Sequence, residues 1–202
     1  MNLAGVLDPT ARTALLVEGE SDRAAVETLA RRRALPLRPG RVQVVPMGGV
    51  TNLGHHLAAL SAHPEVRVGG LYDAGEEHVV VRSLDRAGLR PPGDTADLTT
   101  VGFFRCERDL EDELVRALGV EGCVAVIAAQ GALRSLERLR GQPAQRGWSM
   151  EQVLHRFLGS GSGRKELYAR LFTEAVPDDR VPQPLDAALR WALADQAPAS
   201  HP

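Results

Sequence analysis

The sequence has few cysteines, no excess of basic charge and no long apolar run, and each shortage excludes a class of protein. Two cysteines, Cys106 and Cys123, are too few for a disulfide framework and too widely spaced for a paired metal-ligand motif, which favours a reducing cytoplasm. No apolar run approaches the roughly 20 residues that span a bilayer, and no basic-then-apolar leader opens the chain. We therefore expect a cytoplasmic protein with no membrane partner.

The formal net charge of −2 excludes a global basic field. Nucleic acid can then be held only by a local patch, because counterion release needs positive charge close to the phosphates. Of the 24 basic residues only Lys165 is a lysine. Lysine is a flexible point charge that can give up its proton, whereas the guanidinium of arginine stays charged. Lys165 is therefore a candidate functional residue, although chance retention explains it equally well.

The 202 residues, 44% of them hydrophobic, are enough for one principal α/β domain with a small extension. The apolar patterns predict strands at 13–18, 41–46, 66–72 and 99–104, alternating with helices at 21–33, 50–62, 75–88 and 109–119. Ser21 is the expected N-cap of the first helix. From about residue 121 only helices are predicted, at 121–129, 131–140, 149–158, 162–175 and 183–194.

This alternation predicts a mostly parallel four-stranded sheet with helices on both faces, followed by a helical C-terminal extension. The expected division is an α/β core at 1–120, a helical extension packed on it at 121–195, and a flexible tail at 196–202.

Acidic residues stand where the predicted strands end. Glu18 follows the first strand, Asp73 follows the third, and Glu111 lies shortly after the fourth, while Asp22 opens the first helix. Ligands of open α/β sheets collect beyond the carboxyl ends of the strands. Carboxylates that meet there repel one another unless a cation neutralises them, and such oxygen ligands suit Mg²⁺ or Mn²⁺. The alternative for Asp22 is a purely structural role at the helix N-terminus.

The segments "LLVEGESD", "GGLYDAGEE" and "DLEDEL" together resemble the Toprim fold, whose signature is a glutamate after the first strand and Asp-x-Asp after the third. The form EG-x-x-D, the later helices and the lysine in "SGSGRKELYARLF" are most similar to the Toprim half of OLD-family (overcoming lysogenisation defect) nucleases. The resemblance covers roughly residues 12 to 193.

The resemblance implies a Mg²⁺- or Mn²⁺-dependent nuclease, most simply an endonuclease, or a nucleotidyl hydrolase. Such an enzyme would cleave phosphodiester bonds in nucleic acid, with DNA favoured, by a two-metal mechanism. Glu18 and Asp22 would hold one cation, with Glu18 also serving in proton transfer. Asp73 and Glu111 would contribute to the metal positions, and Lys165 would stabilise charge on the scissile phosphate.

The sequence departs from the family pattern at two points. Gly75 replaces the second acid of Asp-x-Asp, so a ligand is missing unless Glu76 or Glu77 takes its place; Glu77 completes our predicted metal set. OLD nucleases also carry an ATPase, but the sequence has no Gly-x-x-x-x-Gly-Lys-[Ser/Thr]. Any ATPase is therefore expected to be a separate partner, or absent.

Gly75 also supports an alternative, a catalytically impaired Toprim-like module that binds DNA or a partner. A phosphoacceptor receiver domain is disfavoured, because such domains place adjacent acids after the first strand. A topoisomerase or primase is disfavoured by the size of the chain.

Overall fold

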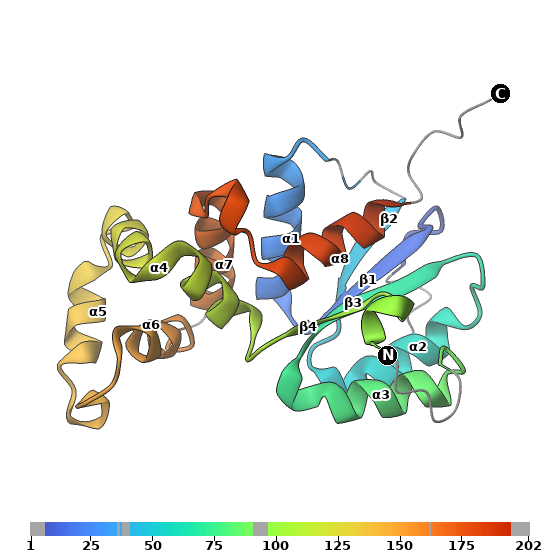
Figure 1. Ribbon diagram of the computed structural model, residues 1–202, viewed down its shortest axis with the longest axis horizontal. Helices are drawn as coiled ribbons and strands as arrows, with labels where there is room; N and C mark the ends of the chain where they lie inside the picture. Colours follow the sequence, from blue (N-terminus) through green and yellow to red (C-terminus); the bar gives the residue numbers. More distant parts are fainter. Residues whose placement is uncertain (1–6, 36, 38–40, 91–96, 162, 195–202) are drawn as a thin grey trace.

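The computed structural model describes residues 7–35, 37, 41–90, 97–161 and 163–194, and a parallel sheet forms its centre (Figure 1). The strands are β1 (Thr13–Val17), β2 (Val42–Pro46), β3 (Arg67–Asp73) and β4 (Phe103–Cys106). β1 pairs with β2 and β3, and β3 pairs with β4, which gives the spatial order β2-β1-β3-β4 with all pairs parallel. The predicted four-stranded sheet is confirmed.

The α-helices follow the strands and then continue alone. They are α1 (Glu20–Arg32), α2 (Leu53–Leu60), α3 (Glu77–Arg86), α4 (Leu110–Ala129), α5 (Leu133–Arg140), α6 (Met150–Leu158), α7 (Arg164–Ala175) and α8 (Gln183–Leu193). Short 3₁₀ turns include η3 (Ala74–Glu76), η4 (Leu98–Val101) and η5 (Pro143–Gln145). Within the described part of the chain, no helix is both long and apolar enough to cross a membrane.

Helices cover both faces of the sheet, as predicted. Alternate side chains of β1 point to opposite faces. Leu15 and Val17 belong to an apolar core shared with α1 and with the C-terminal helices α4 to α8. Ala14 and Leu16 belong to a second core shared with α2 and α3. Figure 1 shows α2 and α3 together on one side of the sheet, with α1 and α8 on the other.

Some C-terminal helices pack on the sheet and others pack on neighbouring helices. α8 packs across β3 and β4, and α7 packs against both α1 and α4. α5 and α6 lie farther out, beside α4, in Figure 1. α4 crosses the expected boundary at residue 120, with a kink at Gly119, whose φ is 77°. The division of the chain at 120 therefore stays a prediction, and the tail at 196–202 lies outside the described residues.

Two local predictions are wrong. The fourth strand begins at Phe103 rather than residue 99, because residues 98–101 form a 3₁₀ turn capped by the Asp97 side chain, which accepts from the amide of Thr99. Gly102 ends that turn with φ 84°, and Trp191 occupies the space of a Cβ there. The N-cap of α1 is Gly19 rather than Ser21, and Asp22 Oδ2 accepts from the Gly19 amide at 2.9 Å.

Candidate metal centre

The acidic residues gather at the point where the chain connections leave the sheet in opposite directions. β1 and β3 are neighbours, but β1 leads into α1 on one face and β3 leads toward α3 on the other. Such a switch point leaves a crevice at the carboxyl ends of the two strands. Glu18 follows β1 and Asp73 ends β3, so both stand at this crevice.

A glycine turn after β2 fixes the backbone at Glu18. Gly48 and Gly49 have φ values of 70° and 112°, which side chains rarely adopt. Their amides donate to the carbonyl oxygen of Glu18 at 3.0 and 3.1 Å. This turn forms one wall of a cleft of about 480 Å³ that is also lined by Glu18, Asp22, Asp73, Asp109, Glu111 and Lys165.

Three carboxylates form the tightest acidic group in the described part of the chain. Glu18, Asp73 and Glu76 each offer an oxygen, and these three oxygens all lie within 4.8 Å of one another. Glu76 comes from η3, the 3₁₀ turn that continues directly from Asp73. Its Oε2 is buried and has no hydrogen-bond partner among the described residues. This oxygen is therefore available as a ligand atom.

Burial and neighbouring negative charge raise the pKa of two of these carboxylates, Asp73 and Glu76. Burial, reinforced by the charges of Glu18 and Asp109, raises the pKa of Asp73 from 3.8 to about 8. Burial and the charge of Glu18 also raise the pKa of Glu76. Both shifts have the cause expected when like charges share a poorly solvated site without a counter-ion. A cation at this point would remove the repulsion.

A second group adjoins the first across the same cleft. Burial and then the charge of Glu111 raise the pKa of Asp22 from 3.8 to about 7. Glu111, in the first turn of α4, is only 5% exposed. Its Oε1 lies 3.4 Å from the Nζ of Lys165 at the start of α7, without hydrogen-bond geometry. Burial lowers the pKa of Lys165, but Glu111 and the other carboxylates outweigh it, so the net shift is upward and the amine stays charged.

A histidine of α6 anchors the rim of the cleft. His155 Nε2 lies 2.5 Å from Asp109 Oδ2, and both side chains are largely buried. The other oxygen of Asp109 caps α4 by accepting from the Asp112 amide at 2.8 Å. The contact joins residues 46 positions apart and fixes the start of the helix that carries Glu111. This contact could not be predicted from the sequence, because a single histidine on an amphipathic helix is most often a surface or core residue.

The structure brings five of the six predicted site residues to one cleft. Glu18, Asp22, Asp73, Glu111 and Lys165 all line it. The sixth, Glu77, lies apart from the acidic group, with its Oε2 3.7 Å from Arg105 Nη1. The neighbouring glutamate, Glu76, stands with Glu18 and Asp73 instead.

The candidate ligand atoms suit a hard divalent cation. All its candidate ligands are carboxylate oxygens, which Mg²⁺ and Mn²⁺ prefer over nitrogen or sulfur. Gly75 leaves its surroundings open, since no atom lies within 4 Å of a Cβ built there. The missing second acid of Asp-x-Asp therefore leaves room beside Asp73, and Glu76 supplies an acid one residue later.

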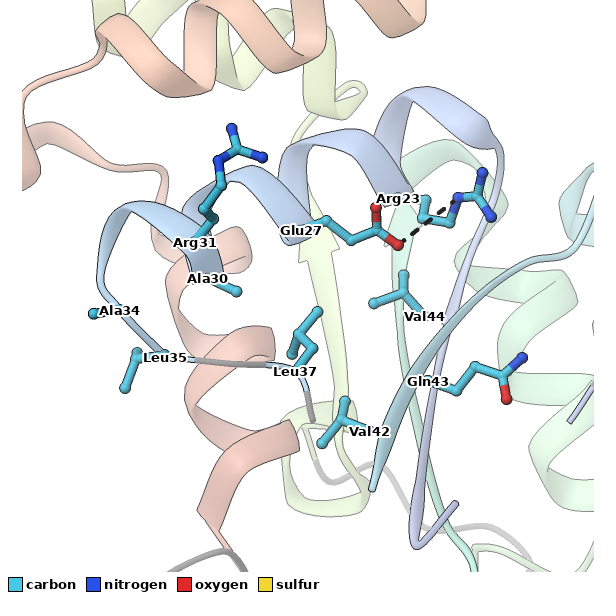
Figure 2. Close-up of a pocket in the computed structure, with 10 residues that line it drawn as sticks. All are labelled: Arg23, Glu27, Ala30, Arg31, Ala34, Leu35, Leu37, Val42, Gln43 and Val44. Atoms are coloured by element: carbon cyan, nitrogen blue, oxygen red, sulfur yellow. Dashed lines mark ion pairs between the residues drawn. The ribbon is translucent and has the colours of Figure 1, made fainter. Parts of the chain in front are cut away.

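Another hollow in the structure has a different chemistry. It has a volume of about 660 Å³, lies between α1 and β2, and is lined by apolar residues including Leu35, Val42 and Val44 (Figure 2). Its one carboxylate, Glu27, lies 4.0 Å from the Arg23 Nε, as the dashed line shows. This hollow lacks the convergent oxygens of the cleft.

Comparison with known proteins finds proteins that this chain resembles in sequence and fold. Residues 10–74 match the family model of the overcoming lysogenization defect protein-like Toprim domain. The C-terminal region of the Xanthomonas campestris pv. campestris OLD protein is similar, with a TM-score of 0.67 and 25% identity over 92% of this chain and 95% of that one. The corresponding region of the Burkholderia pseudomallei OLD protein has a TM-score of 0.66 and 20% identity over 93% and 99% of the two chains. No curated protein matches the sequence. The predicted resemblance to the Toprim half of OLD proteins is confirmed.

Proposed function

Because the chain has the OLD-like Toprim fold with an acidic cluster at its switch point, we propose that it is a metal-dependent nuclease that hydrolyses phosphodiester bonds in DNA. The observation that carries the proposal is the approach of the Glu18, Asp73 and Glu76 oxygens to within 4.8 Å of one another. A wider acidic surface would only be solvated, whereas oxygens this close favour a shared cation.

In this proposal the carboxylates divide between two metal positions. Glu18, Asp73 and Glu76 hold one Mg²⁺ or Mn²⁺ ion, and Asp22 and Glu111 contribute to the second. The bound ions supply Lewis-acid activation and neutralise charge on the phosphate oxygens. Asp22 and Asp73 release their protons on binding, because ligating carboxylates must be ionised.

The remaining roles belong to charged groups of the chain itself. Lys165 stays protonated beside Glu111 and donates to a non-bridging phosphate oxygen, where negative charge grows in the transition state. Glu18 takes up the proton of the attacking water, whose oxygen forms the new bond to phosphorus while the sugar oxygen departs. Asp109, held by His155, keeps the first turn of α4 and its Glu111 in place.

Gly75 favours a second candidate, a Toprim-like module that binds metal and DNA but does not cleave. In both cases we propose a cytoplasmic setting, which suits the buried free thiols of Cys106 and Cys123. A separate ATPase is a proposed partner, by analogy with OLD nucleases.

The test is incubation of the purified protein with supercoiled and linear DNA in Mg²⁺, Mn²⁺ or chelator. Glu18→Ala removes a ligand, and Glu107→Ala is the matched control, because Glu107 is exposed and pairs with Arg116 outside the cleft. The nuclease requires cleavage that chelator and Glu18→Ala abolish and Glu107→Ala leaves intact. A metal-induced rise in melting temperature without any cleavage would favour the binding module. Cleavage unchanged by Glu18→Ala would refute the proposed site.

A further inference from the structure

The segment from α5 to α6 carries a concentration of exposed arginines that the site does not use. Its five arginines outnumber its two carboxylates, although the chain as a whole has a charge of −2. The five, which we call the α5–α6 arginines, are exposed residues: Arg134, Arg138, Arg140, Arg146 and Arg156. Within the described part of the chain, none of them makes an ion pair or a side-chain hydrogen bond.

Pairing is common for arginines elsewhere in this protein. On α1, Arg31 pairs with Glu174 at 3.0 Å and Arg32 with Asp178 at 2.9 Å. On α4, Arg116 lies within ion-pair distance of three carboxylates. The α5–α6 arginines are thus a local basic excess in an acidic protein. Mutual repulsion disfavours such a group unless a polyanion approaches it.

An exposed tryptophan stands among these arginines. Trp148 lies in the turn between η5 and α6 and is 42% exposed. It is not part of a larger apolar face, because α5 turns its own leucines inward, with Leu136 only 1% exposed. An exposed indole in a segment that carries five exposed arginines is suited to stacking on a base. A membrane or a protein partner would instead need a broader apolar area.

The same segment is attached to the acidic cleft. α6 packs on α4, and its His155 contacts Asp109 at the rim of the cleft. Arg108, next to Asp109, lies 3.4 Å from the His155 Nδ1. In Figure 1, α4 runs from the end of β4 toward α5 and α6. α6 therefore links the segment that carries the α5–α6 arginines to the rim of the cleft.

We propose that the α5–α6 arginines hold the sugar-phosphate backbone of the nucleic acid and that Trp148 stacks on an unpaired base of it. The inference rests on the proposed function for the identity of the polyanion. The acidic cleft repels phosphate when no metal is bound, so a basic surface outside it supplies binding energy that the metal-free cleft lacks. The stacking tryptophan makes single-stranded or frayed DNA the preferred substrate class.

The test is fluorescence anisotropy of labelled DNA across a range of salt concentrations, with Ca²⁺ in place of Mg²⁺ to limit cleavage. Arg134→Gln/Arg138→Gln removes two charges four residues apart on α5. The matched control is Arg82→Gln/Arg86→Gln, which removes two charges with the same spacing on α3, across the sheet. For single strands the α5 double variant should weaken binding at least about fivefold and reduce the salt slope by about 1.4, at about 0.7 per phosphate contact. The α3 double variant should bind as the unaltered protein does.

Trp148→Ala should weaken binding of single-stranded DNA by about 5- to 150-fold, which is the range of base–aromatic stacking, and should weaken binding of blunt duplex far less. Unaltered affinity and salt slope in the α5 double variant would overturn the inference. So would equal losses in both double variants, or tighter binding to phosphatidylserine vesicles than to DNA. Circular dichroism of each variant verifies that it is folded.

Hydrolysis of bis(p-nitrophenyl) phosphate with Mn²⁺ separates the inference from the proposed function, because this small diester needs no extended binding surface. If the protein hydrolyses it but binds DNA independently of the α5–α6 arginines, the inference fails and the nuclease stands. If DNA binding depends on those arginines and neither substrate is cleaved, the inference holds and the nuclease fails.

Discussion

Neutralising Asp22 should stabilise the metal-free protein, because in the absence of a cation its carboxylate is held close to other negative charges. Burial and Glu111 raise its pKa from 3.8 to about 7, so ionisation costs more in the folded than in the unfolded state. At 1.36 kcal/mol per pKa unit the difference is at most about 4 kcal/mol. Screening by water in the open cleft reduces it to roughly 2 kcal/mol. For a chain of this size that corresponds to about 4–8 °C in melting temperature.

The effect of Asp22 on the stability of the folded protein depends on pH. Between pH 4 and 7 the folded protein keeps a proton on Asp22 that the unfolded chain has lost, so stability falls as pH rises through this window. At pH 8 the ionised carboxylate exerts its full penalty, and asparagine exerts none. At pH 5 the folded Asp22 is neutral while the unfolded side chain is largely ionised, so only part of the penalty applies. Asp22→Asn should therefore raise the melting temperature more at pH 8 than at pH 5.

The assay is thermal unfolding of both proteins in chelator at pH 5 and pH 8. Asparagine can still accept the Gly19 amide hydrogen bond, so the helix cap is preserved. Glu27→Gln is the matched control, since Glu27 is exposed on the same helix outside the cleft. It should shift stability by no more than about 0.5 kcal/mol. A melting temperature of Asp22→Asn that is unchanged at pH 8, or raised equally at both pH values, would show that ionised Asp22 does not destabilise the metal-free fold.

Three further predictions concern the metal and the lysine. Glu76→Gln should abolish the rise in melting temperature that Mn²⁺ produces and Glu77→Gln should keep it; equal losses would contradict the assignment of Glu76. Lys165→Ala should lower DNA cleavage by about 10²- to 10³-fold while calorimetry still detects Mn²⁺ binding, and near-normal cleavage would remove the lysine from the mechanism. Mg²⁺ affinity measured by calorimetry should increase from pH 6 to pH 8, because Asp22 and Asp73, with pKa values of about 7 and 8, must lose protons to bind; a flat profile would argue against both as ligands.

The main site residues could be predicted from sequence because strand ends fix their positions. Glu18 directly follows an apolar run, and Asp73 ends another, so parallel pairing of β1 and β3 necessarily places both at one edge. Only the family resemblance predicted that Glu111 and Lys165 belong to one site, because their contact joins α4 to α7. No local pattern encodes the packing of those two helices.

The choice between Glu76 and Glu77 could not be made from sequence. Consecutive residues on a helical turn point about 100° apart, so the exact start of the turn decides which glutamate faces the cleft. The chain makes a 3₁₀ turn over Ala74–Glu76 before α3 begins, and this phase places Glu76 beside Asp73. The sequence pattern also missed the late start of β4. A 3₁₀ turn capped by Asp97 and ended by the left-handed Gly102 precedes this strand.

Anomalous diffraction from crystals of the protein grown with Mn²⁺ would locate the metal ion itself. We expect a manganese peak within bonding distance of carboxylate oxygens of Glu18, Asp73 and Glu76. Crystals saturated with Mn²⁺ that show no peak between these three side chains, or bind the ion only elsewhere, would rule out the proposed metal site.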